Sequence, residues 1–297
     1  MLISKGEKLF QRINVVVLLL LSLIVIYPFI NIFAISLNDG KDAMMGGIYL
    51  WPRKFSISAY KMIFSESNLV HSAYISVLRT VIGTFLGIAS TAVVAYVLSN
   101  KELLFRRTIL FLYVFTMYFS GGIIPEYLLI KQLGMYNNLS VYIVPGLVTA
   151  MNVMMMRQFF EELPHAILES ARIDGASEWK ILAKVVIPMA TPALATISLF
   201  IAVGHWTSWF DTYFYTNNDM KLSTLQGVLV KILMEAQAQQ MSASQANLKD
   251  IMQNNTRPTA EVLKMATIAI TTVPILLVYP FVQKYFVGGI TMGAVKE

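Results

Sequence analysis

Aromatic and polar side chains alternate over one short stretch of an otherwise apolar segment. The stretch runs from Gly204 to Asp211 and reads Gly-His-Trp-Thr-Ser-Trp-Phe-Asp. Aromatic faces beside hydroxyl and imidazole groups suit a solute rich in hydroxyl groups, such as a carbohydrate, because polar groups that leave water need hydrogen-bond partners. Asn152 lies in a second apolar segment among methionines, at a depth where an unpaired amide is costly. The candidates for a solute pathway are Asn152, His205, Trp206, Ser208 and Trp209.

A purely structural interpretation of these residues stays open. Tryptophan near the end of a membrane helix commonly belongs to an interfacial belt, and Asn152 can hydrogen-bond a neighbouring helix. Arg79 raises a similar question, because a charge inside an apolar segment is costly. Its side chain is expected to pair with another group or to extend towards the membrane surface, with contact to the solute as the alternative.

No pattern of residues indicates catalysis. The chain has no cysteine, which excludes disulfides, thiolate metal sites and cysteine nucleophiles. His165 and His205 lie far apart without metal-ligand spacing, and no glycine–lysine loop of the Walker type occurs. The sequence therefore predicts no catalytic residue, no metal and no cofactor bound by this chain. The net charge of +6 comes from scattered lysines and arginines, which does not indicate nucleic-acid binding.

The composition is that of a membrane protein. The 297 residues are 56% hydrophobic and 13% charged, whereas soluble domains carry about 25% charged residues. A helix of about 20 apolar residues crosses the hydrocarbon layer of a bilayer. We predict an all-α integral membrane protein with one transmembrane domain over 1–297. The expected spans are about 14–36, 72–99, 108–130, 139–156, 190–211 and 265–282.

Several segments depart from simple spans. Ser120-Gly121-Gly122 and Pro145-Gly146 predict broken or kinked helices within two of the spans. The loops 37–71 and 212–264 are long and polar, and apolar residues in Leu222–Met234 follow a roughly helical spacing. No stable helix is expected in the glycine-containing tail from Gly288 to Glu297.

The distribution of basic residues predicts the orientation. The loops on the side of the termini hold twelve lysines and arginines, and the longer opposite loops hold nine. Because basic loops favour the cytoplasm, both termini and the loop 157–189 are expected inside, and the loops 37–71 and 212–264 outside.

The loop 157–189 is expected to form two short helices around Gly175. Pro164 suits the first helical position, and the helix His165–Asp174 would end in a left-handed cap at Gly175. Ser177 can cap the second helix, which Pro188 and Pro192 would end. Small side chains between the two helices let the surface of another protein approach the backbone closely.

The same loop carries a family resemblance. Glu169-Ser170-Ala171, then Asp174-Gly175-Ala176, then Val185, Ile187 and Pro188 resemble the EAA signature of ABC-importer permeases, with mild departures at Ser170, Val185 and Ile187. The run from Ser120 to Ala176 and the ending from Tyr279 to Lys296 resemble the carbohydrate branch of that family. Within this branch, the chain is most similar to the subgroup that handles complex oligosaccharides such as alginate fragments.

The resemblance implies a fold, a function and partners. The fold would be that of a type I ABC importer permease in the bacterial cytoplasmic (inner) membrane. The chain would pair with a homologous permease as a heterodimer, and work with two ATPase subunits and an extracytoplasmic solute-binding protein to import a carbohydrate, in particular an oligosaccharide. ATP and Mg would bind to the ATPase.

The resemblance also assigns roles in the loop. Glu169, Arg172 and Asp174 would make charged contacts at the rim of an ATPase cleft, with Ala171, Gly175 and Ala176 packed at its centre. The ATPase-coupling residues are thus Glu169, Ser170, Ala171, Arg172, Asp174, Gly175 and Ala176. The tail would be a second ATPase contact, or a frayed terminus.

Two other functions stay open. One is an ABC importer permease for a non-sugar solute, such as an amino acid, a peptide or phosphate. The other is an ion-driven secondary transporter, which needs acidic residues inside the spans. Glu126 and Asp211, both near expected outer ends, come closest to that requirement.

Overall fold

The computed structural model describes residues 5–65, 68–216, 221–245 and 258–294, and these are helices joined by short loops. The one pairing of β type among the described residues is an isolated bridge between Asn38 and Phe55. The predicted all-α fold is therefore confirmed. The elements are α1 (Lys5–Ser36), α2 (Gly40–Ala43), α3 (Ser58–Phe64), α4 (Leu69–Ser99), α5 (Arg106–Tyr118), α6 (Ile123–Gln132), the 3-10 helices η1 (Leu139–Tyr142) and η2 (Val144–Gly146), α7 (Ala150–Glu161), α8 (His165–Ile173), α9 (Glu178–Ile181), the π-helical turn η3 (Leu182–Val186), α10 (Ile187–Met189), α11 (Thr191–Thr207), α12 (Phe210–Tyr215), α13 (Leu225–Gln245) and α15 (Ala260–Ala294).

Three described helices are long and apolar enough to cross a membrane on their own. They are Gly6–Ser36, Leu69–Ser99 and Ala260–Pro280. Three pairs of helices pass the same criteria together but are bent: α5 with α6 by 115°, the η1–η2 segment with α7 by 46°, and the α9–α10 segment with α11 by 86°. The described chain therefore holds six spans if each bent pair counts as one.

Two of these bends lie at or next to the helix breakers singled out in the sequence. The break between α5 and α6 contains Ser120-Gly121-Gly122, where Gly122 has a φ of +90°. The second bend directly follows Pro145-Gly146. Both predicted interruptions are confirmed, because glycine and proline weaken the regular helix there.

Contacts divide the chain into two compact units. The first comprises Met1–Ser67 with Leu229–Pro274, and the second comprises Asn68–Val228 with Ile275–Glu297. In the first unit, the polar loop after α1 is folded around one carboxylate. Asp42 accepts hydrogen bonds from Asn38 Nδ2 at 2.9 Å and from Arg53 Nε at 3.0 Å. These bonds, that from Asn38 first, lower the pKa of Asp42.

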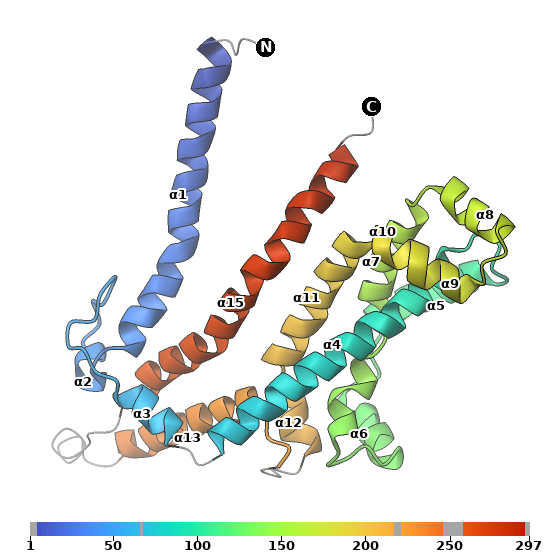
Figure 1. The fold of residues 1–297 in the computed structure, drawn as a ribbon. Helices are drawn as coiled ribbons and strands as arrows, with labels where there is room; N and C mark the ends of the chain where they lie inside the picture. Colours follow the sequence, from blue (N-terminus) through green and yellow to red (C-terminus); the bar gives the residue numbers. More distant parts are fainter. Residues whose placement is uncertain (1–4, 66–67, 217–220, 246–257, 295–297) are drawn as a thin grey trace. The chain divides into compact units, whose positions relative to one another are not determined.

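The second unit is built on α4. Helices α7 and α11 pack along it, with α8 and α9 near one end of this bundle and α6 and α12 near the other (Figure 1). Small residues let the helices approach closely: a Cβ on Gly87 would lie 3.4 Å from Ile201 Cγ2. Ala92, Ala95 and Val153 are almost fully buried in this core. The packing of α4 against α7 and α11 thus holds together the part of the chain that contains the candidate sites.

Two sequence-based expectations about helix ends were wrong. The tail was expected to have no helix after Gly288, but α15 continues to Ala294, because an established helix propagates through single weak residues more easily than a new helix starts. The fifth span was expected to run to Asp211, but α11 ends at Thr207 and Ser208 is extended, with φ −70° and ψ 129°. The predicted helix in Leu222–Met234 is confirmed by α13, which begins at Leu225 and extends to Gln245.

Candidate functional site

The loop between α7 and α11 forms an exposed elbow, which we define as α8, the turn at Gly175 and α9. Gly175 has a φ of +76°, in the left-handed region that favours glycine. The backbone N–H of Gly175 donates to Arg172 O at 3.0 Å, and that of Ala176 donates to Ala171 O at 3.0 Å. This pair of bonds is a Schellman motif, which satisfies carbonyl groups at the end of α8. The predicted left-handed cap at Gly175 is confirmed.

Other details of the elbow differ from the prediction. Pro164 precedes the first helical residue, with a ψ of 114°. Ser177 occupies the N-cap position of α9 without a side-chain capping bond. The second helix does not end at Pro188, because the wider turn η3 precedes this proline and lets the chain continue as α10 despite the missing N–H. The bend comes after Met189, between the two prolines.

The coupling residues expected from the family resemblance lie on two sides of the elbow. Ala171 and Ala176 are partly buried and pack, with Leu168, against the core of the second unit. The others are exposed: Glu169, Ser170, Arg172, Asp174 and Gly175. The outer surface also presents Ile173 at 86% and Trp179 at 69% exposure. Ala171 and Ala176 are thus partly covered by the chain's own core, Ile173 and Trp179 are exposed apolar groups of the elbow, and the placement of the two alanines at the centre of an ATPase contact stays a prediction.

One carboxylate connects the elbow to α4. Glu178 on α9 accepts a hydrogen bond from the Tyr96 hydroxyl on α4. It also accepts one from Arg172 Nε on α8 at 3.0 Å, which raises the pKa of Arg172. Three helices thus meet at one side chain. Arg172 is engaged within the chain rather than extended alone into solvent.

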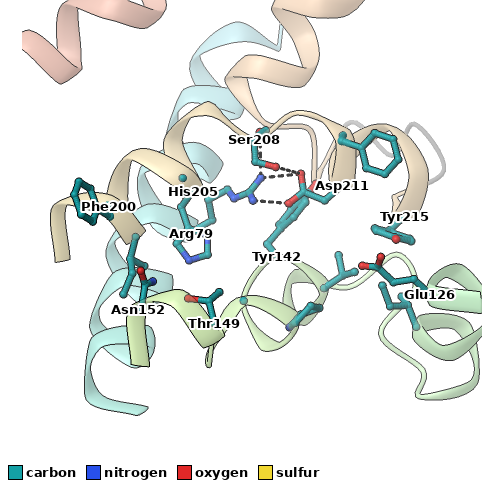
Figure 2. Close-up of a pocket in the computed structure, with 17 residues that line it drawn as sticks. Arg79, Glu126, Tyr142, Thr149, Asn152, Phe200, His205, Ser208, Asp211 and Tyr215 are labelled. Carbon is teal, nitrogen blue, oxygen red and sulfur yellow. Dashed lines mark hydrogen bonds and ion pairs between the residues drawn. The ribbon is translucent and has the colours of Figure 1, made fainter. Parts of the chain in front are cut away.

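A cavity of about 380 Å³ lies in the second unit, between α4, α7, α11 and the segments around α6 and α12 (Figure 2). This volume falls within the range of small-molecule sites in proteins. Its walls combine aromatic rings, hydroxyl groups, an amide and charged groups. The lining residues with polar or aromatic side chains are Arg79, Glu126, Tyr142, Thr149, Asn152, Phe200, His205, Ser208, Phe210, Asp211 and Tyr215.

An ion pair organises the wall of this cavity. Arg79 on α4 donates to both carboxylate oxygens of Asp211, with Nη1–Oδ1 at 3.2 Å and Nη2–Oδ2 at 2.5 Å (Figure 2). The guanidinium carbon also lies 4.4 Å from the centroid of the Tyr142 ring, which is a cation–π distance. The side chain of Arg79 is 2% exposed and that of Asp211 is 19% exposed. Of pairing and extension towards the membrane surface, pairing is therefore the one observed, and contact between Arg79 and the solute stays a prediction.

The structure brings together three of the five predicted pathway residues. Asn152, His205 and Ser208 line the cavity, whereas Trp206 and Trp209 are not among its lining residues. The Trp209 ring instead packs edge-on against Phe210, at 6.1 Å between centroids. The break in the helix at Ser208 separates the two tryptophans, because it changes the direction of the chain between them.

The imidazole ring of His205 packs against two glycines, which leave room for it because they carry no side chain. A Cβ on Gly83 would lie 2.4 Å from His205 Nε2, and one on Gly146 would lie 3.8 Å from its Cε1. The imidazole therefore occupies space left by a glycine on α4 and lies near a second glycine on η2. This packing fixes the ring at the cavity wall.

Sequence reasoning left several lining residues out of the predicted site. The sequence singles out Arg79, Glu126 and Asp211 separately, without joining them in one site, and gives no signal for Tyr142. The available signal was the arginine itself, because a charge inside a span needs a partner and few acidic residues lie near the spans.

The fold and the two sites define a class of protein. A helical membrane bundle that contains an open cavity lined by polar, aromatic and aliphatic groups, and that presents an elbow at one end, has the features of a transport subunit. No group of three or more possible metal ligands occurs among the described residues. The family model described as "Binding-protein-dependent transport system inner membrane component" matches residues 4–292. The chain belongs to this family.

Individual relatives agree over nearly the full length. The chain is 37% identical over 290 residues to the polygalacturonan/rhamnogalacturonan transport system permease protein YtcP of Bacillus subtilis, which covers 98% of this chain and 99% of the relative. It is 35% identical over 293 residues to the protein LplC of the same organism, covering 99% and 97%. The resemblance to ABC-importer permeases is therefore confirmed.

A solved structure shows the same fold. It is that of a bacterial ABC transporter involved in the import of the acidic polysaccharide alginate. One of its chains matches with a TM-score of 0.75 and 30% identity, covering 95% of this chain and 98% of that one. The predicted type I permease fold is confirmed by this match together with the family model.

Proposed function

We propose that this chain is the permease subunit of an ATP-driven, binding-protein-dependent importer for a carbohydrate, in particular an oligosaccharide. Relatives named for the transport of polygalacturonan, arabinooligosaccharides and diacetylchitobiose support the substrate class. The cavity supports it as well, because it places aromatic rings beside hydroxyl, amide and carboxylate groups. Asn152, His205 and Ser208 are the proposed contacts to the solute. Trp209 would contribute indirectly, by packing against Phe210, which lines the cavity. Trp206 stays a prediction.

The observation that carries the proposal is the elbow. Its glycine turn is closed by two backbone hydrogen bonds, its polar residues are exposed, and it belongs to the same unit as the cavity. We place it in the cytoplasm, with both termini, on the basis of the distribution of lysine and arginine. The outer loops 37–71 and 212–264 would then face an extracytoplasmic binding protein.

The remaining parts of the importer would come from other chains. The sequence contains no Walker-type loop, so ATP and Mg are proposed to bind to two separate ATPase subunits. A homologous permease would form a heterodimer with this one and supply the other half of the pathway. Closure of the ATPases would push the elbow and change which side of the membrane the cavity faces.

Gly175 tests this role through two substitutions. No atom lies within 4 Å of a Cβ built on Gly175, so the start of a side chain there has room within the chain, although the φ of +76° strains any residue other than glycine. A bulky tryptophan would in addition obstruct a docked partner. We expect Gly175→Trp to abolish ATP-driven uptake while the protein stays in the membrane. Gly175→Asn is the matched control, because asparagine tolerates the left-handed conformation with a small side chain. We expect this variant to retain most uptake.

Uptake in membrane vesicles that contain the whole complex is the measurement. Loss of uptake in both variants would point to a requirement for the glycine backbone alone. Uptake at the level of the unmodified complex with Gly175→Trp would contradict the coupling role. Uptake of an amino acid, peptide or phosphate instead of saccharides would support the non-sugar importer.

A further inference from the structure

The hydrogen bond between Tyr96 and Glu178 joins the elbow to α4, the helix that contributes Arg79 to the cavity wall. Tyr96 is partly buried near the end of α4, where its ring packs edge-on against Phe160 of α7, at 6.5 Å between centroids. Its hydroxyl donates to Glu178 at the start of α9. Glu178 also binds Arg172 at the end of α8, on the opposite side of the Gly175 turn. One carboxylate therefore fixes the geometry of the turn and attaches it to α4.

Helix α4 connects this contact with the cavity. It is a single helix from Leu69 to Ser99, without a proline and without a described break (Figure 1). Tyr96 and Arg79 lie 17 residues apart on it, which corresponds to about 25 Å at 1.5 Å per residue. Arg79 holds Asp211 at the junction of α11 and α12. A displacement of the Tyr96 end therefore reaches the cavity wall through a rigid element.

The apolar contacts of the elbow do not provide the same directional link. Leu168, Ala171 and Ala176 pack against the core, but such contacts are non-directional and allow sliding. A hydrogen bond to a charged group has a preferred distance and angle, and it is stronger than a bond between neutral groups. The polar contact therefore sets a fixed distance and orientation between α9 and α4, which apolar packing alone does not set.

We propose that Tyr96 and Glu178 are positioning residues that transmit the movement of the elbow to α4 and thereby to the cavity. The inference rests on the proposed function and assigns a residue pair to its coupling step. It also explains why Glu178 lies at this position although it is exposed. The side chains of Glu178 and Arg172 are 58% and 47% exposed, and exposed ion pairs contribute little to stability. If the contact between Tyr96 and Glu178 served stability alone, its loss would therefore leave the solute transported per ATP almost unchanged.

The test compares single-atom changes in the reconstituted complex. Tyr96→Phe removes the hydroxyl and keeps the ring against Phe160. Glu178→Gln keeps an oxygen that accepts from Tyr96 but removes the charge. Tyr113→Phe is the matched control, because Tyr113 packs against the same core and no described residue hydrogen-bonds its hydroxyl. The measured quantities are solute transported and ATP hydrolysed in proteoliposomes, and the thermal midpoint of each variant.

Measured coupling energies between protein sites correspond to roughly 5–150-fold effects. We expect Tyr96→Phe to lower the solute transported per ATP by at least about fivefold, with ATP hydrolysis and thermal midpoint close to the unmodified complex. Glu178→Gln should give a smaller loss, and Tyr113→Phe none. An unchanged ratio in Tyr96→Phe overturns the inference while leaving the proposed function intact. Absence of ATP-driven transport in the unmodified complex would instead overturn the proposed function.

Discussion

Replacing Asp211 by asparagine should destabilise the second unit more than any other single change to an ion pair described here. The substitution leaves the Arg79 guanidinium with 2% of its side chain exposed and no carboxylate partner. Removing one partner of a buried ion pair costs about 3–5 kcal/mol, because the remaining charge is buried without compensation. The Tyr142 ring, the Ser208 carbonyl at 3.4 Å and one oxygen of the new amide still face Arg79. These contacts place the expected loss near the lower end, at about 3 kcal/mol.

Two further variants isolate the cause of the loss. Arg172→Gln breaks an ion pair with half-exposed partners, for which a loss of about 0–1 kcal/mol is expected. The double variant Arg79→Met with Asp211→Leu removes both charges. Because replacing a whole buried pair by apolar groups is often neutral or stabilising, it should recover much of the stability lost with Asp211→Asn.

The assay is thermal unfolding of the purified protein in detergent, followed by the fraction that stays monodisperse. The expected order of midpoints is unmodified protein, Arg172→Gln, the double variant, and Asp211→Asn lowest. A midpoint for Asp211→Asn no lower than that for Arg172→Gln would refute the reasoning. It would mean that Arg79 reaches water or another partner once Asp211 has lost its charge.

Two other predictions concern packing and pH. Gly83→Ala places a Cβ 2.4 Å from His205 Nε2; overpacking of this kind costs about 1–3 kcal/mol, so the thermal midpoint should fall, and an unchanged midpoint would show that His205 moves freely. Asp42 has a lowered pKa in the folded chain, so its bonds stabilise the loop above the unfolded pKa of about 3.9 and are lost as the pH falls through the folded value. The protection of residues 37–57 against hydrogen exchange, taken relative to the intrinsic exchange rate at each pH, should therefore fall at acid pH. Asp42→Asn should remove that pH dependence, and equal protection profiles for both proteins would contradict the assignment.

The features that the sequence predicted well depend on local chemistry. A left-handed cap follows from Gly175 because glycine adopts a positive φ without strain. The interruptions near Gly122 and Pro145 likewise follow from residues that weaken a helix wherever they occur. Hydrophobicity predicts an all-helical membrane protein, because apolar runs of about 20 residues are long enough to cross the bilayer as helices, which satisfy their own backbone groups in lipid.

The features that escaped prediction depend on distant parts of the chain. Arg79 and Asp211 are separated by 132 positions, so nothing local in the sequence pairs them. The two tryptophans were expected in the pathway with their neighbours, but the extended Ser208 divides the helix there. Whether Ala171 faces a partner or its own core depends on how α8 packs, which the spacing of residues does not specify.

The most direct test of the account is ATP hydrolysis by the reconstituted complex of this permease with its partner permease, ATPases and binding protein. The rate would be measured with a panel of saccharides, with and without the binding protein. We predict that one saccharide class raises the rate only when the binding protein is present. A complex that contains no ATPase, or purified permease that alone moves solute down an ion gradient, would contradict the account and favour a secondary transporter.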